Sequence, residues 1–137
     1  MKKISIGDLP LYRAAAPNVR DNLVVCDMQD GAENLSVGIG IYNKGQASEF
    51  HTHIKEEEVM IYLKGEGIMR LEDGTEAKLT RGDVTYVPAN EPHKLINTGD
   101  SEFVFLFVYS PMGPEKNIRK WDIVEGEHYT LDDLVNL

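Results

Sequence analysis

The stretch GQASEFHTHIKEEEVMIYLKG, residues 45–65, decides the fold of this chain. It places His51 and His53 one residue apart, then three successive glutamates, then an apolar run that ends at Gly65. Side chains two residues apart on an extended strand point to the same face, so the two imidazoles project together. Two unpaired imidazoles are costly to bury. A shared metal ion removes that cost, because imidazole is a common metal ligand.

A carboxylate just downstream is the natural next ligand, and three glutamates are available: Glu56, Glu57 and Glu58. Strand alternation puts Glu58 on the same face as Met60 and Tyr62. A distant ligand is needed to close the site, and His93 is the best candidate because it follows a proline-bounded turn and opens a strand of its own. The residues alone leave a second interpretation open, in which the histidine pair is a coincidence and the acidic run is a solvated loop.

Outward from this stretch, the first 110 residues consist of short β-rich runs separated by turn signals. Such even spacing of short strands indicates an antiparallel sandwich or barrel. The expected strands cover residues 22–28, 35–42, 59–65, 67–71, 76–80, 83–88, 93–97 and 103–110.

The C-terminal tail has a different pattern from the strand-rich part. Residues 113–121 predict one or two helical turns that start at Pro114. Residues 130–137 predict a helical segment with Thr130 as its N-cap. We expect these pieces to pack on the outside of the barrel or to pair with a second subunit. One domain is expected over residues 1–137.

Composition restricts the partners. The net charge of −9 and the pI near 4.8 repel a phosphate backbone, and no Lys/Arg cluster opposes them, so we expect no nucleic-acid partner. No apolar window of membrane-spanning length occurs, so we expect no membrane partner. The single cysteine, Cys26, cannot form an internal disulfide, and a reducing cytoplasm is the expected location.

Two motifs make the chain resemble the cupin superfamily. The first reads glycine, five residues, His-x-His, three or four residues, glutamate, six residues, glycine. Its positions are filled here by Gly45, His51, His53, Glu58 and Gly65. The second reads glycine, five residues, Pro-x-Gly, two residues, histidine, three residues, asparagine, and is filled by Gly82, Pro88, Asn90, His93 and Asn97. Its one departure is Asn90 at a family glycine, and asparagine tolerates left-handed backbone angles well.

The resemblance implies a double-stranded β-helix, a small jelly-roll barrel with a core over about 20–111, followed by a tail of short helical segments over 112–137. It also implies that His51, His53, Glu58 and His93 bind one divalent ion. The closing glycine of the first motif selects Glu58 among the three glutamates. Fe, Mn, Ni, Co and Zn all suit such a ligand set. Cupin barrels commonly pair, so a homodimer is expected.

An open metal position favours an enzyme that acts on a small polar organic molecule. By family likeness the reaction is that of an oxygenase, isomerase, decarboxylase or lyase. The alternative is a non-catalytic module that binds or senses a small molecule. Glu49, which shares the parity of His51, and Tyr62 are the candidate catalytic residues.

A further patterned face lies on the last expected strand, residues 103–110. Its alternating aromatic side chains predict either an apolar pocket wall or an ordinary core: Phe103, Phe105, Phe107 and Tyr109.

Overall fold

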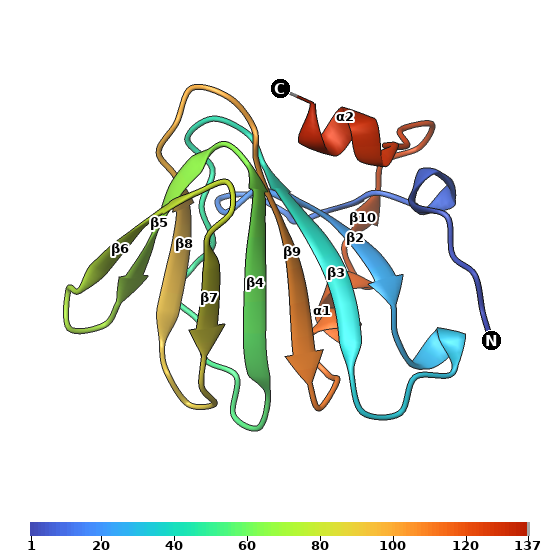
Figure 1. Ribbon diagram of the computed structural model, residues 1–137, viewed down its shortest axis with the longest axis horizontal. Helices are drawn as coiled ribbons and strands as arrows, with labels where there is room; N and C mark the ends of the chain where they lie inside the picture. The colour runs from blue at the N-terminus through green and yellow to red at the C-terminus, as the bar shows by residue number, and fades with distance from the viewer. Residues whose placement is uncertain (137) are drawn as a thin grey trace.

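Two antiparallel sheets form the body of the protein, and the computed structural model describes residues 1–136 (Figure 1). The larger sheet contains, in spatial order, β10 (Asp122–Ile123), β1 (Tyr12–Arg13), β2 (Asp21–Cys26), β3 (Ser36–Tyr42), β9 (Phe103–Ser110), β4 (Glu57–Lys64) and β7 (Val84–Val87). The smaller sheet contains β6 (Glu76–Thr80), β5 (Glu66–Leu71) and β8 (His93–Asn97). This architecture confirms the predicted all-β jelly roll.

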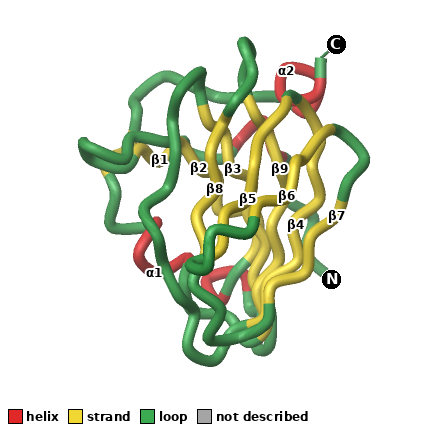
Figure 2. Tube along the Cα trace, turned by 90° about the vertical axis from the view of Figure 1, so that its left-hand side faces the viewer, coloured by secondary structure: helices red, strands yellow, loops and turns green. Residues whose placement is uncertain are grey.

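The short helices lie at the margins of the sheets. Two are single 3-10 turns, η1 (Ile6–Asp8) and η2 (Met28–Asp30), and two are α-helical, α1 (Glu115–Ile118) and α2 (Leu131–Val135). Pro114 precedes α1 as predicted, and Thr130 caps α2 in a reciprocal pair with Asp133. Position 137 of the expected segment lies outside the described residues. Figures 1 and 2 show α2 beyond one end of the strands, away from α1. Within residues 1–136, no helix is long and apolar enough to cross a membrane.

The larger sheet buries both of its faces over its central strands. The inner face looks into the barrel and is rich in aromatic and sulfur-containing side chains, among them Tyr42, Met60, Phe105, Phe107 and Tyr109. The outer face carries an aliphatic cluster: Leu11, Leu23, Ile39, Ile41, Val104 and Leu134. Leu134 belongs to α2, so the C-terminal helix covers this outer cluster. The expectation that the tail packs outside the barrel is therefore met for α2.

Two glycines of β3 let the inner face accept large rings. Gly38 and Gly40 lie opposite Phe107 and Phe105 of β9 in the sheet register. A Cβ atom on Gly38 would stand 2.2 Å from Cζ of Phe107, and one on Gly40 would stand 2.3 Å from Cζ of Phe105. Each ring therefore lies flat over glycine backbone, where any larger residue would clash.

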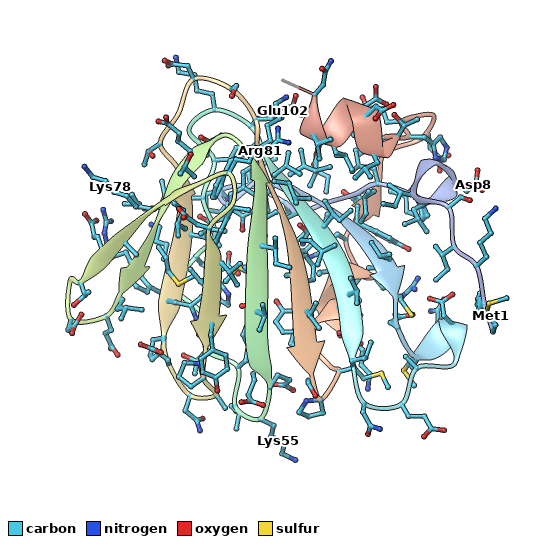
Figure 3. The ribbon with its side chains drawn as sticks, in the orientation of Figure 1. Met1, Asp8, Lys55, Lys78, Arg81 and Glu102 are labelled. Atoms are coloured by element: carbon cyan, nitrogen blue, oxygen red, sulfur yellow. The ribbon has the colours of Figure 1, made fainter. Side chains whose placement is uncertain are left out.

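The sequence-based prediction missed two very short strands, β1 and β10. They pair with each other as Tyr12 with Ile123 and Arg13 with Asp122, which joins the two ends of the chain at the edge of the large sheet. Two-residue strands have no periodicity of their own, so only long-range pairing defines them. Figure 3 shows charged side chains at both ends of the barrel, with Lys55 at the end where β4 begins and Arg81 and Glu102 at the other.

Candidate metal centre and ligand cavity

The segment 46–53 brings the histidine pair to β8. It runs antiparallel to that strand through four backbone hydrogen bonds, two of which join His51 and His93 reciprocally at 3.0 Å. Regular strand pairing is limited to isolated bridges at Ala47 and His51, so the segment is an extended edge rather than a continuous strand. This pairing places His93, forty-two positions downstream of His51, directly opposite it.

The chain continues from this pairing into a turn that holds His53. The amide of Asn90 donates to the carbonyl of His53 at 2.7 Å. Asn90 has φ of 67°, the left-handed value that its place in the second motif predicted. The turn is therefore kept without the family glycine, and it fixes the backbone on both sides of the candidate site.

Three imidazoles converge where these segments meet. One ring nitrogen from each of His51, His53 and His93 lies within 4.8 Å of the others, a grouping that can hold a metal ion. The ring centroids are 4.2 to 5.5 Å apart. His128, the fourth histidine, lies apart in the tail, where its Nδ1 bonds the carbonyl of Leu9 at 3.1 Å.

Backbone carbonyls set the orientation of two imidazoles. Nδ1 of His51 bonds the carbonyl of Glu49 at 2.9 Å, and Nδ1 of His93 bonds the carbonyl of Glu91 at 2.9 Å. A carbonyl oxygen only accepts, so each Nδ1 carries the proton and each Nε2 keeps a free lone pair. This is the usual arrangement by which neighbouring groups orient histidine ligands.

Glu58 of β4 lies beside two of these imidazoles but is not part of the group of three whose ligand atoms lie within 4.8 Å of one another. Its side chain is buried, and its Oε1 lies 3.4 Å from Nε2 of His93 and 3.8 Å from Nε2 of His53. Those three atoms are buried and have no hydrogen-bond partner. An unpartnered buried polar atom costs about 1–3 kcal/mol. Three such atoms facing one point fit a divalent cation, which suits two imidazoles and a carboxylate at once.

Burial also controls the charge of these groups. It lowers the pKa of His51 to about 4 and moves the pKa of His53 below its ordinary value. Both imidazoles are therefore neutral near pH 7, as ligation requires. Burial opposes a charge on His93 as well, but the Glu58 carboxylate, the Glu91 carbonyl and the Glu91 charge together outweigh it and raise the His93 pKa. Tyr109 faces Glu58 on β9, and burial followed by that carboxylate raises its pKa well above the usual value.

A cavity of about 700 Å³ opens from this cluster along the inner face of the large sheet. Phe105, Phe107 and Tyr109 line it, while Phe103 lies in the core beyond it. The aromatic face of this strand is therefore a pocket wall over residues 105–109 and an ordinary core at Phe103. The volume is typical of pockets for small organic molecules.

Of the two residues expected to be catalytic, Glu49 lies at the rim of this cavity. Its half-exposed carboxylate is paired with Arg20 at 3.2 Å. Tyr62 does not line the cavity among the described residues. It is 1% exposed, stacks on Phe103 and bonds Thr85 at 2.8 Å, so it packs as a core residue, and the catalytic role expected for it stays a prediction. Strand alternation correctly predicted that Tyr62 points to the inner face of the sheet, but it does not tell how far along the barrel the side chain lies.

The far wall of the cavity comes from residues that sequence reasoning did not select. Asn22 of β2 lines it, together with Arg20 and with Asn117 and Trp121 of the segment that contains α1. No motif marks these positions. The single usable signal is the alternation of β2, which places Asn22 on the same face as Val24.

Polar contacts anchor the segment 113–121, and apart from Gly113 the residues that make them do not line the cavity. Glu115 is 1% exposed and accepts hydrogen bonds from Ser36 Oγ at 2.8 Å and from the Gly113 amide at 2.9 Å. The Arg119 guanidinium donates two hydrogen bonds to the Asp27 carboxylate, at 2.7 and 2.9 Å. Charge-assisted bidentate contacts of this kind are strong and directional. They hold α1 against β2 as a fixed part of the cavity wall.

With this geometry in view, comparison with known proteins identifies the family. The model of the cupin domain matches residues 38–109, and the chain belongs to the cupin family. A glucose-6-phosphate isomerase of Pyrococcus furiosus is 38% identical over 64 residues, which are 44% of this chain and 34% of that protein. An oxalate-binding protein of Thermotoga maritima is 33% identical over 64 residues, 47% of this chain and 52% of that protein. The chain thus spans about a third to a half of the length of these curated relatives.

Solved structures give the same fold. The polyketide cyclase RemF of Streptomyces resistomycificus superposes with a TM-score of 0.73 at 18% identity, over 98% of this chain and 90% of that one. A predicted oxalate decarboxylase of Thermotoga maritima superposes with a TM-score of 0.72 at 19% identity, over 81% of this chain and 100% of that one. At such identities the likeness concerns the fold alone.

Proposed function

We propose that this cupin is a metal-dependent enzyme that acts on a small organic molecule. One divalent ion would be held by His51, His53, His93 and Glu58. The observation that carries the proposal is the convergence of buried, unpartnered ligand atoms at one end of an open cavity. Closed structural metal sites have no such adjoining space.

The ion, when bound, supplies a Lewis acid that polarises an oxygen of the ligand. The protein's own residues supply the rest. The carbonyls of Glu49 and Glu91 keep two imidazoles in the ligating tautomer. Tyr109 keeps its hydroxyl proton beside Glu58, and aromatic side chains of the same strand line the adjoining cavity.

The reaction class follows from the relatives only as a proposal. Those named above are an isomerase and a binding protein, and the isomerase match extends to 37% identity over 123 residues in the Thermococcus onnurineus protein, which is 77% of this chain and 65% of that one. We therefore place isomerisation first, ahead of decarboxylation, lyase chemistry and oxygenation. The second candidate, ligand binding without turnover, is favoured by the likeness to an oxalate-binding protein.

Metal content measured by plasma mass spectrometry tests the proposal. Wild-type protein, purified without a tag or chelator above pH 7, should carry about one divalent ion per chain. His53→Ala should lower occupancy at least tenfold, because it removes a ligand from the centre. His128→Ala is the matched control and should keep the wild-type content, since His128 lies in the tail.

If wild type neither holds an ion nor binds added Fe, Mn, Ni, Co or Zn, the proposed function is wrong. If the ion is present and ligands bind saturably but are never converted, the binding alternative replaces the enzyme.

The cytoplasmic location and the homodimer expected from the sequence remain predictions, and gel filtration with light scattering tests the dimer.

A further inference from the structure

Among the described residues, one buried polar group without a hydrogen-bond partner lines the cavity away from the histidines. Asn22 is 7% exposed and lines the cavity, and its Oδ1 has no hydrogen-bond partner. A buried amide in this state is destabilising unless something bonds it. Rotation by 180° about the terminal side-chain bond exchanges oxygen and nitrogen with little change in shape. A hydroxyl group suits either orientation, because it both donates and accepts.

The register of the sheet separates this group from the candidate metal centre. Glu58 pairs with Tyr109, whereas Asn22 pairs with Gly40 and Gly40 pairs with Phe105. Tyr109 and Phe105 are four residues apart on β9, which is roughly 13 Å of antiparallel strand. A ligand that reaches both ends therefore has a body of several carbons, and a two-carbon diacid is too short.

Apolar side chains form part of the wall between the two ends. Phe105 and Phe107 lie over the glycines of β3, and Met60 and Leu95 face the same space. Each hydroxyl of a sugar placed against these side chains would lose its bonds to water and gain none. The middle of the cavity therefore fits a ring or chain of carbon.

Among the described residues, the far end also has no cation that is free to bind phosphate. Arg20 is the basic residue there, and its guanidinium already bonds the carbonyl of Asn18 at 2.8 Å and both oxygens of Glu49 at 3.2 Å. The guanidinium also lies 4.8 Å from the centre of the Trp121 ring. An anionic group on the ligand is therefore directed to the metal end, which would carry the positive charge.

From these observations we infer the ligand class: a carboxylic acid with an apolar, ring-sized body and a hydroxyl group at its far end. The carboxylate would bind at the centre formed by His51, His53, Glu58 and His93, and the hydroxyl would bond Asn22. This inference rests on the proposed function, because the carboxylate needs the ion. The inferred ligand differs from oxalate in its length and from glucose 6-phosphate in its apolar body and its lack of a phosphate.

Isothermal titration calorimetry on Zn²⁺-loaded protein tests the inference with a matched pair of probes. 3-(4-Hydroxyphenyl)propanoate carries the hydroxyl, and 3-(4-methylphenyl)propanoate has a methyl group of similar size in its place. The hydroxylated acid should bind wild type at least about fivefold more tightly, as expected for one net hydrogen bond. Oxalate and glucose 6-phosphate should bind more weakly than either aromatic acid.

The variant Asn22→Leu should abolish the preference, so that both aromatic acids bind equally. Asn43→Leu, on an exposed turn, should keep the wild-type preference. The comparison of the two acids on wild type stands without any variant, so a folding defect in Asn22→Leu does not decide the outcome.

The possible failures are distinguishable because metal content is measured on the same samples. Protein that takes up no zinc overturns both the proposed function and this inference. Zinc-loaded protein that prefers oxalate or glucose 6-phosphate, or that binds the two aromatic acids equally, overturns the inference alone. A preference that survives in Asn22→Leu also overturns it, because the hydroxyl is then bonded elsewhere.

Discussion

The two faces of the large sheet share the same strands but differ in kind. Along β9, Val104 points into an aliphatic outer cluster, while Phe105 and Tyr109 point into a cavity bordered by imidazoles, a carboxylate and an amide. The outer cluster is closed by α2. The inner face is left open over about 700 Å³ and keeps polar groups unpartnered. The difference indicates that the outer face stabilises the barrel. The inner face contributes less to stability, because it keeps open volume and unpartnered polar groups.

The largest expected effect on stability lies in the outer cluster. Leu23→Ala leaves a void among side chains that are fully buried, and should lower the free energy of unfolding by about 3 kcal/mol. Urea denaturation measures it, and the metal content of the folded protein should not change. Leu35→Ala, at an exposed position, is the control and should cost less than about 1 kcal/mol. A small loss at Leu23 would show that the outer face is not the main source of stability.

A substitution on β3 should affect both faces. Gly40→Ala puts a methyl group where the Phe105 ring lies, so the ring must move toward the cavity. We expect a loss of about 2 kcal/mol in unfolding free energy and weaker binding of the hydroxylated aromatic acid.

Gly7→Ala is the matched control, because an added Cβ there comes no closer than 4.0 Å to Thr130. Unchanged stability and ligand affinity in Gly40→Ala would mean that the Phe105 ring is free to relocate, and that the inner face is not tightly packed at this point.

The smallest expected effect lies at the cap of α2. Thr130→Ala removes the hydroxyl that accepts the Asp133 amide at 3.2 Å and should cost about 1 kcal/mol. Because α2 covers the outer cluster, the loss should appear in urea denaturation while zinc content and ligand affinity stay at wild-type values.

Thr130→Ser retains a capping hydroxyl and should recover most of the lost stability. If Thr130→Ala changed ligand affinity instead, the separation between a stabilising outer face and a functional inner face would be wrong.

The candidate metal residues were accessible to sequence reasoning because the signals are local. The i, i+2 spacing of His51 and His53 fixes their common face, and strand alternation places Glu58 inside the barrel. The same alternation gives the face of Tyr62 but not its position along the barrel, so it does not distinguish a core residue from one that lines the cavity. His93 was selected because it follows a proline-bounded turn and opens a strand, whereas its distance from His51 depends on backbone pairing that no spacing rule contains.

The far wall was beyond prediction for a related reason. Asn22 is a single amide in an ordinary strand, and Trp121 follows a four-residue helix in the tail. Their meeting depends on the pairing of β1 with β10 and on contacts between α1 and β2, which are long-range and carry no periodic signal. The fold class was predicted correctly without these contacts because it depends on many strands. A ligand site depends on a few side chains, so a single missed contact leaves its prediction incomplete.

The anchoring of segment 113–121 bears on how ligand range can change within this family. Its fixing contacts, Arg119 with Asp27 and Glu115 with Ser36, involve partners that do not line the cavity, whereas Asn117 and Trp121 do. Asn22 and Trp121 also lie outside residues 38–109, the part matched by the cupin domain. Asn117 and Trp121 thus face the cavity from a segment whose anchoring contacts lie elsewhere. Under the proposed function, ligand preference and metal binding would therefore depend on different stretches of the chain.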